Sequence, residues 1–131
     1  MALYSSDQSP RVLRLTWTTR DDLRANRDLV FVYGDNVARE GQRGLARQMR
    51  GEPNAHPISI SWTPFEPFTH ASAPDAIEHI SKDLEALQAR TPKLIVWPLG
   101  GLVPEFLTFP DELHQHLRTQ AKKRFALVDP V

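Results

Sequence analysis

The stretch Leu29-Val-Phe-Val-Tyr-Gly-Asp-Asn36, followed by Gly41-Gln-Arg-Gly44-Leu-Ala-Arg-Gln-Met49, decides the fold of this 131-residue chain. Its uninterrupted apolar run predicts a strand buried on both faces, and the polar residues after it predict a loop where that strand ends. Gly51 follows this region closely, and the two remaining glycines, Gly100 and Gly101, follow a second apolar run at 94–97. We therefore expect one site built from two strand-to-loop junctions, beyond the carboxyl ends of the strands.

The rest of the chain alternates between short apolar stretches and amphipathic ones, which predicts strands alternating with helices. Residues 11–18 alternate apolar and polar side chains, as in an edge strand with one solvated face. Further strands are expected at 29–33, 58–62, 93–97 and 125–128, and helical segments are expected to begin near Thr19, Gly44, Ser72 and Phe109. This order predicts an α/β fold: a single three-layer domain at 11–131 with a mixed, largely parallel sheet, preceded by a flexible tail at 1–10.

The composition narrows the classes of partner. Sixteen basic and sixteen acidic residues give no net charge, so bulk electrostatics favours neither a nucleic acid nor a membrane. The absence of cysteine excludes disulfides, thiolate metal sites and cysteine nucleophiles, and fits a reducing compartment. The N-terminal residues have no signal-peptide pattern, and no apolar run approaches the ~20 residues of a spanning helix. We expect a cytoplasmic protein without a membrane partner.

The first junction carries the candidate ligand-binding groups. Asn36 can present its amide to a hydroxyl group, and Asp35 can accept hydrogen bonds from a sugar or an amine. The alternative is an ordinary turn, because Asp and Asn also satisfy their own backbone locally. Gly41 and Gly44 can let backbone amides approach a phosphate where a helix begins, or they simply give a flexible connection. The spacing matches neither a Walker motif nor a dinucleotide fingerprint.

Four arginines follow one another at helical spacing. Arg39, Arg43, Arg47 and Arg50 would form one cationic ridge if their segment were helical, and arginine forks suit phosphates. The ridge would meet an acidic protein, a nucleotide or, less favoured, a nucleic acid; the alternative is a solvated helix face. Trp62 ends a strand on the same rim and can stack on a base.

The histidines indicate no metal site. His114 and His116 are two residues apart, whereas a metal-binding pair on a helix needs a spacing of three or four. His56 is the one histidine near the rim that we would test as a proton carrier. No cofactor and no catalytic residue is assigned from the sequence, and whether the protein is an enzyme stays open.

The chain resembles the macro domain and its short macro-like relatives in bacterial and phage genomes. The resemblance covers residues 29–104 and rests on 30–36, on the Gly41–Ala46 stretch, on Arg50-Gly-Glu-Pro-Asn-Ala55, and on Val96-Trp-Pro-Leu-Gly-Gly-Leu102. It implies a pocket for ADP-ribose or a related nucleotide; some members hydrolyse ADP-ribose derivatives and others only bind them. By this resemblance the ligand-binding residues would be Gly34, Asp35, Asn36, Gly41, Gly44, Leu45, Ala46, Trp62, Gly100, Gly101 and Leu102.

The second junction departs from the family pattern. Val103, Pro104 and Glu105 stand where a phosphate would need amides, and proline has no amide hydrogen to donate. The sequence therefore leaves two main hypotheses. The first is a nucleotide-binding domain of the ADP-ribose type, with or without weak hydrolase activity. The second is a non-catalytic interaction or inhibitor protein, of phage or other origin, that keeps the scaffold with a degenerate pocket. A third is nucleic-acid binding through the arginine ridge.

Overall fold

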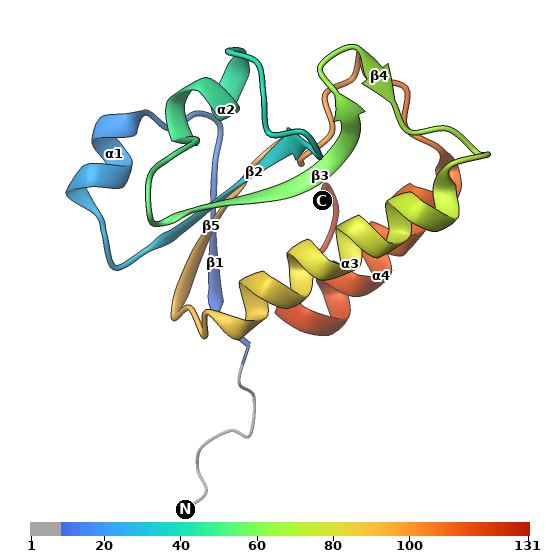
Figure 1. Ribbon diagram of the computed structural model, residues 1–131. Coiled ribbons are helices and arrows are strands. Elements are labelled where there is room, and N and C mark those ends of the chain that lie inside the picture. The colour runs from blue at the N-terminus through green and yellow to red at the C-terminus, as the bar shows by residue number, and fades with distance from the viewer. Residues whose placement is uncertain (1–8) are drawn as a thin grey trace, which may run out of the picture.

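The computed structural model describes residues 9–131, which form a single α/β domain of three layers (Figure 1). The strands are β1 (Arg11–Leu15), β2 (Val30–Asn36), β3 (Ala55–Thr63), β4 (Glu66–Pro67) and β5 (Leu94–Pro98). The helices are α1 (Arg20–Ala25), α2 (Gly44–Met49), α3 (Ala73–Ala89) and α4 (Asp111–Phe125). The predicted fold class is confirmed, while most of the tail predicted at 1–10 lies outside the described residues.

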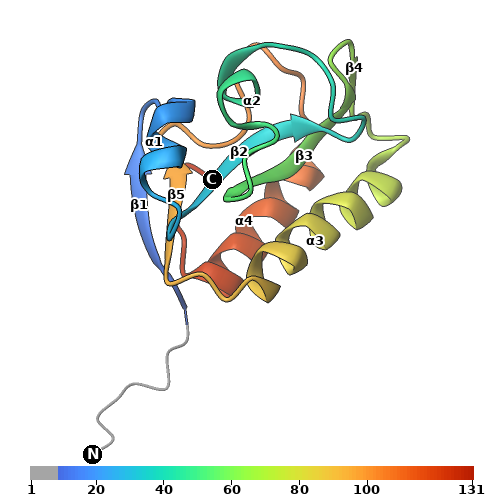
Figure 2. The ribbon, with the colours of Figure 1, turned by 60° about the vertical axis from the view of Figure 1, so that its left-hand side comes forward.

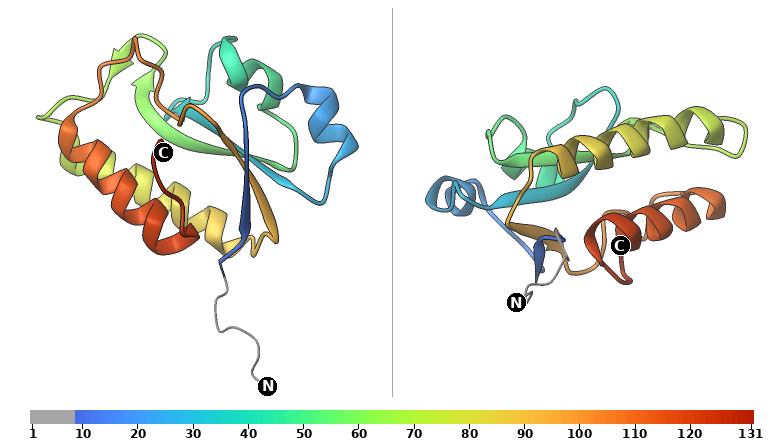
Figure 3. Two further views of the ribbon diagram at one scale, coloured as in Figure 1. Left: turned by 180° about the vertical axis from the view of Figure 1, so that it is seen from behind. Right: turned by 90° about the horizontal axis from the view of Figure 1, so that it is seen from below.

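The sheet has the strand order β1-β5-β2-β3-β4. Its first four strands are parallel, and β4 pairs antiparallel with β3, so the sheet is mixed and largely parallel as predicted. Helices α1 and α2 lie on one face, and α3 and α4 lie side by side on the other (Figures 2 and 3). Strand β2 is central and buried on both faces, which explains its uninterrupted apolar run.

Strand β1 is the predicted edge strand, but its apolar side chains are the exposed ones. Leu13 and Leu15 are 42% and 36% exposed, whereas Arg14 on the other face is half-buried. The guanidinium of Arg14 turns toward the C-terminal residues and donates to the carbonyl of Val128 (3.2 Å) and to that of Pro130. The Arg14 side chain of the edge strand thus connects the sheet to residues 128–130 through hydrogen bonds.

The prediction of a closing strand at 125–128 is wrong. Phe125 is the last residue of α4, and Ala126 ends the helix in the left-handed conformation, with φ 54°. The residues that follow form neither helix nor strand, and Arg14 donates to the carbonyls of Val128 and Pro130 among them.

Helices α3 and α4 close the larger core. The stripe Ile80, Leu84 and Leu87 of α3 is fully buried, as the spacing of three and four predicts. On the opposite face, α1 begins with the capping box expected at Thr19. The backbone N–H of Asp22 donates to the Thr19 hydroxyl, and the backbone N–H of Thr19 donates to the Asp22 carboxylate. Among residues 9–131, no helix has the length and apolar character needed to cross a membrane.

Candidate functional site

Two adjoining cavities of about 470 and 570 Å³ lie beyond the carboxyl ends of β2 and β5, and we call them together the rim cleft. Their walls come from the first glycine loop (residues 34–46), the second glycine loop (residues 98–107) and the β3–β4 turn. The residues that line both cavities are Gly34, Arg43, Ala46, Ile60, Pro104 and Phe106. The ligand rim predicted from the strand order therefore contains an open cleft.

Gly34 is where the two glycine loops meet. A Cβ atom at this position would lie 2.5 Å from the carbonyl oxygen of Leu102 and 2.8 Å from the Ile60 side chain. Only glycine allows this close approach, since real Cβ atoms do not come within 3.0 Å of another heavy atom. The glycine at the end of β2 thus fixes the distance between the two walls of the rim cleft.

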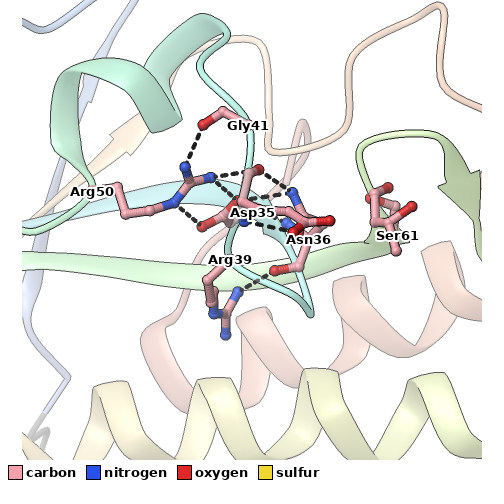
Figure 4. Close-up of polar contacts among 8 residues, drawn as sticks. Asp35, Asn36, Arg39, Gly41, Arg50 and Ser61 are labelled. Atoms are coloured by element: carbon pink, nitrogen blue, oxygen red, sulfur yellow. Dashed lines mark hydrogen bonds and ion pairs between the residues drawn. The ribbon is translucent and has the colours of Figure 1, made fainter.

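Asp35 is committed to an internal ion pair. Its carboxylate accepts two hydrogen bonds from Arg50, at 2.6 Å from Nη2 and 3.1 Å from Nε (Figure 4). The Asp35 side chain is 1% exposed, so the pair is largely removed from solvent. The same guanidinium donates to the carbonyls of Glu40 (3.1 Å) and Gly41 (2.5 Å). Asp35 and Arg50 therefore brace the first glycine loop from within.

Asn36 is also turned to its own loop. Its amide nitrogen donates to the carbonyl of Glu40 (2.8 Å), and its side-chain oxygen accepts from the backbone N–H of Glu40 (3.2 Å). These bonds use the amide group that we expected to meet a hydroxyl group of a ligand, so Asn36 holds the loop that lines the cleft. The turn interpretation of Asp35 and Asn36 is the one this geometry favours.

The neighbouring phenol of Tyr33 is held in its protonated form. Burial, and then the negative charge of Asp35, raise the pKa of Tyr33 to about 12. Tyr33 is 2% exposed and packs with Met49 in the smaller core beneath α2. It lines neither cavity of the rim cleft, and it is a structural residue of the smaller core and not a general base near neutral pH.

The arginine ridge does not form. Helix α2 covers only Gly44–Met49, so Arg39 lies in the loop with φ 54° and Arg43 and Arg50 are the cap residues. Arg39 pairs instead with Asp83 of α3 (3.1 Å), away from the Arg50–Asp35 pair. Arg43 and Arg47 stay exposed and form no ion pair within the described part of the chain. The glycines of the first loop shortened the helix that the ridge required.

The beginning of α2 faces the rim cleft as predicted. Gly44, Leu45 and Ala46 line the second cavity, and Gly41 lines the first. Gly41 and Gly44 have φ angles of 94° and 57°, a backbone conformation that glycine adopts more readily than other residues. Within residues 9–131, the N-cap residue Arg43 makes no side-chain hydrogen bond to the helix.

Trp62 does not line either cavity of the rim cleft. Its ring packs edge-on against Phe68 and His79, with centroids 4.8 and 5.4 Å away, and its indole donates to Ser72 (3.2 Å). The pairing of β3 with β4 is irregular between Ser61 and Thr63, and Ser61 lines the cleft while its neighbour Trp62 does not. The prediction that Trp62 stacks on a base is not supported by this position.

Two amide donors of the second glycine loop are bonded within the chain. The N–H of Gly101 donates to Pro98 (3.0 Å), and the N–H of Leu102 donates to the carbonyl of Val131 (2.9 Å). Gly101 and Leu102 line the rim cleft, whereas Gly100 lines a smaller cavity of about 290 Å³ beside Val131. The amides of the two glycine-loop residues that line the rim cleft are thus engaged by the chain itself.

Two aromatic side chains at the mouth of the cleft escaped the sequence analysis. Phe65 of the β3–β4 turn and Phe106 of the second glycine loop line the cleft and are 86% and 88% exposed. Large apolar side chains this exposed point to a binding surface when they flank a cavity. Both phenylalanines lie in proline-rich segments of the sequence, but a sequence of this kind does not show whether an aromatic ring is exposed or buried.

His56 is a structural residue. It is 7% exposed, its Nε2 lies 2.8 Å from the carbonyl of Asp83, and its Nδ1 lies 3.2 Å from the guanidinium of Arg90. Because arginine only donates, Nδ1 accepts and Nε2 carries the proton. Burial lowers the pKa of His56, so the neutral ring is favoured. It does not line the rim cleft, and the proton-carrier hypothesis finds no support.

The segment after Arg50 joins the loop that follows α2 to the α1 region through ion pairs and hydrogen bonds. Glu52 accepts from Arg20 (2.5 Å) and Arg27 (2.8 Å), and these hydrogen bonds lower the pKa of its carboxyl. Asn54 donates to the carbonyls of Leu23 and Asn26, both at 3.0 Å. The motif that carried part of the resemblance is therefore structural here. Among the described residues, no cluster of three His, Asp or Glu side chains suits a metal ion.

The sequence matches a family of unknown function, DUF7831, over residues 13–112, and the protein belongs to this family. The matched range contains both glycine loops, Phe65 and Phe106, and it ends as α4 begins. No curated protein and no solved structure matched the chain. The resemblance to the macro domain accordingly stays a prediction.

Proposed function

We propose that the rim cleft binds a nucleotide of the ADP-ribose type. The observation that carries the proposal is the cleft itself, in which both glycine loops, an exposed arginine that forms no ion pair among residues 9–131 and two exposed aromatic rings come together. Aromatic faces suit a nucleobase, and the planar fork of Arg43 suits a phosphate. The apolar floor formed by Ile60 and Ala46 excludes water from the ligand.

The engaged groups of the cleft make the proposal more specific. Asp35, Asn36 and Arg50 shape the first loop, so they are positioning residues in this proposal. Arg43 is the group that meets the phosphates, because its side chain is exposed and lines both cavities. Hydrolase activity is not part of the proposal, since Asp35, the buried carboxylate of the lining, is already bonded to Arg50 and the other lining carboxylate, Glu40, is exposed.

Calorimetry with ADP-ribose tests the proposal. Arg43→Gln is expected to weaken binding about tenfold, because a charge-assisted hydrogen bond is lost. Arg47→Gln is the matched control: it removes an exposed arginine that lies four residues further along and does not line either cavity. Equal loss in both variants would point to general electrostatics, and no heat with millimolar ADP-ribose would reject the proposal.

An acidic protein partner is the second candidate. Arg43, Phe65 and Phe106 are exposed together at the cleft mouth, and Arg47 is exposed nearby on α2. Under this hypothesis, charge reversal at Arg43 and Arg47 abolishes partner binding, while ADP-ribose gives no heat. A gel shift with single-stranded nucleic acid at two salt concentrations tests the third candidate, because phosphate contacts weaken steeply with salt.

A further inference from the structure

The outer side of β1 is an open edge of the sheet. Among residues 9–131, β1 stands at one end of the strand order and pairs with β5 alone (Figure 2). The N–H of Arg11 and the carbonyl of Leu15 bond to residues that flank β5, at 3.0 and 2.9 Å. Successive residues of a strand direct their backbone groups to opposite sides, so the N–H and C=O groups of Val12 and Arg14 point away from β5. An edge of this kind is a template for one more strand.

One face of β1 adds an apolar surface to this open edge. Leu13 lies beside Val96 in the pairing with β5, and Val96 belongs to the smaller core beneath α2. That core does not cover β1, because Leu13 and Leu15 are 42% and 36% exposed, and Trp17 beyond the strand is 54% exposed. Natural proteins protect an edge strand with charged side chains, proline or a bulge. The edge instead presents three large apolar side chains at a spacing of two, which suits the side of another strand.

The charge in the middle of β1 does not protect this edge. Arg14 is half-buried on the opposite face of the strand. Its guanidinium donates to the carbonyls of Val128 (3.2 Å), Pro130 and Pro98 (3.0 Å). These bonds hold the cation against its own domain, so Arg11 at the beginning of β1 is the one other charge in the strand.

We propose that β1 pairs antiparallel with β1 of a second copy of this chain, with Leu13 opposite Leu13. In this register Arg14 of each copy stands opposite Val12 of the other. These two residues carry the outward backbone groups, so they exchange N–H to C=O hydrogen bonds across the pair. The arrangement has two-fold symmetry, in which both copies present the same surface to each other.

The strand is complementary to itself in charge and in apolar surface, which favours a second copy over an unrelated strand. Arg11 stands opposite Leu15, so neither it nor Arg14 faces an arginine of the other copy. Like charges directly opposite each other destabilise a strand pair, and this register avoids them. Leu13 and Leu15 of both copies lie on the same face and form one apolar surface, and apolar pairs across strands stabilise a sheet.

Sedimentation equilibrium of the full chain tests the dimer. The wild-type protein is expected to have twice the mass of one chain at high concentration and to dissociate on dilution, because an edge of five residues makes a small interface. Leu13→Lys is expected to abolish the dimer, since two ammonium groups would face each other in the central pair. Phe65→Lys is the matched control: it replaces a side chain that is 86% exposed beside β4, at the other end of the strand order, and is expected to keep the dimer. Urea denaturation checks that both variants are folded.

Cysteine cross-linking tests the register, because the chain has no cysteine of its own. Leu13→Cys is expected to form a disulfide between two copies under mild oxidation, since Cα atoms directly opposite in a non-hydrogen-bonded pair are about 4.5 Å apart. Leu15→Cys is the control on the same face. Its counterpart lies four residues further along the other strand, at least about 13 Å away, which is beyond the reach of a disulfide.

The proposal is overturned by a wild-type chain that stays monomeric at every concentration, which would leave the edge of β1 to a strand of another protein. A dimer that persists in the folded Leu13→Lys variant would place the interface elsewhere and overturn it as well. So would a disulfide in neither cysteine variant, in both equally, or in Leu15→Cys alone. Neither measurement uses ADP-ribose, so their outcome is independent of the proposed function of the rim cleft.

Discussion

The two glycine loops that form the rim cleft are braced in opposite ways. The first is held by polar side chains from its own neighbourhood, the ion pair Asp35–Arg50 and the amide of Asn36, which are at most fifteen residues apart. The second is held by backbone carbonyls and by residues from distant parts of the chain: Arg14 reaches across 84 residues to Pro98, and Val131 meets Leu102. The first loop is thus a local and electrostatic structure, whereas the second depends on the completed fold.

The largest expected effect comes from removing the cation of the first loop. Arg50→Met leaves the carboxylate of Asp35, 1% exposed, without its partner, and is expected to lower the free energy of unfolding by about 3 kcal/mol. Urea denaturation measures the loss. The double variant Asp35→Asn/Arg50→Met is expected to be more stable than Arg50→Met alone, because no buried charge remains unpaired. A double variant as unstable as the single one would contradict an electrostatic brace.

The next largest effect is expected where the two loops meet. Gly34→Ala forces a Cβ atom against the Leu102 carbonyl and is expected to cost about 2 kcal/mol of unfolding free energy, as overpacking typically does. Gly100→Ala is the control in the second loop, since nothing lies within 4 Å of its added Cβ. The control is expected to change stability by less than about 0.5 kcal/mol. Equal stability of the two variants in urea would contradict the close approach.

Acid is expected to weaken the contact between Glu52 and the arginines beside α1. The pKa of Glu52 is lowered by its hydrogen bonds from Arg20 and Arg27, so its stabilisation is complete above the ordinary value of 4.5. It is lost as the pH falls through the lower folded-state pKa, because the unfolded state binds the proton more tightly. Urea denaturation at a series of pH values should therefore show the free energy of unfolding falling below pH 4.5. Glu52→Gln should show a smaller fall over the same range, and an equal fall in this variant would contradict the contribution of Glu52.

The smallest effect on stability is expected at the mouth of the cleft. Phe106 is 88% exposed, so Phe106→Ala should change the unfolding free energy by less than about 0.5 kcal/mol. The same variant should weaken ADP-ribose binding about tenfold, within the range known for stacking on an aromatic ring. Phe68→Ala is the contrasting variant, because this buried ring should cost about 3 kcal/mol of stability. Unchanged affinity in Phe106→Ala would remove the aromatic contact from the proposed site.

The sequence predicted the parts of the site that depend on local pattern. The apolar run before Gly34 and the beginning of a helix at Gly44 lie where expected, whereas Asp35 and Asn36 are the last two residues of β2 and not part of the loop. The predicted arginine ridge is wrong because Arg39 lies in a loop that Gly41 and Gly44, with positive φ, keep out of the helix. The roles of Trp62 and His56 could not be predicted, since each depends on which side of the sheet α3 covers.

The sequence by itself determined the fold class. A strand buried on both faces has a continuous run of apolar residues, and an element buried on one face has apolar residues at regular spacing. It also determined the position of the ligand rim, since parallel strands bring their carboxyl ends to one side. Only the tertiary structure decided which polar groups stay available there. Asn36, Leu102 and Trp97 have hydrogen-bond donors that the folded chain satisfies with Glu40 and Val131, and a donor already satisfied cannot be recognised in a sequence.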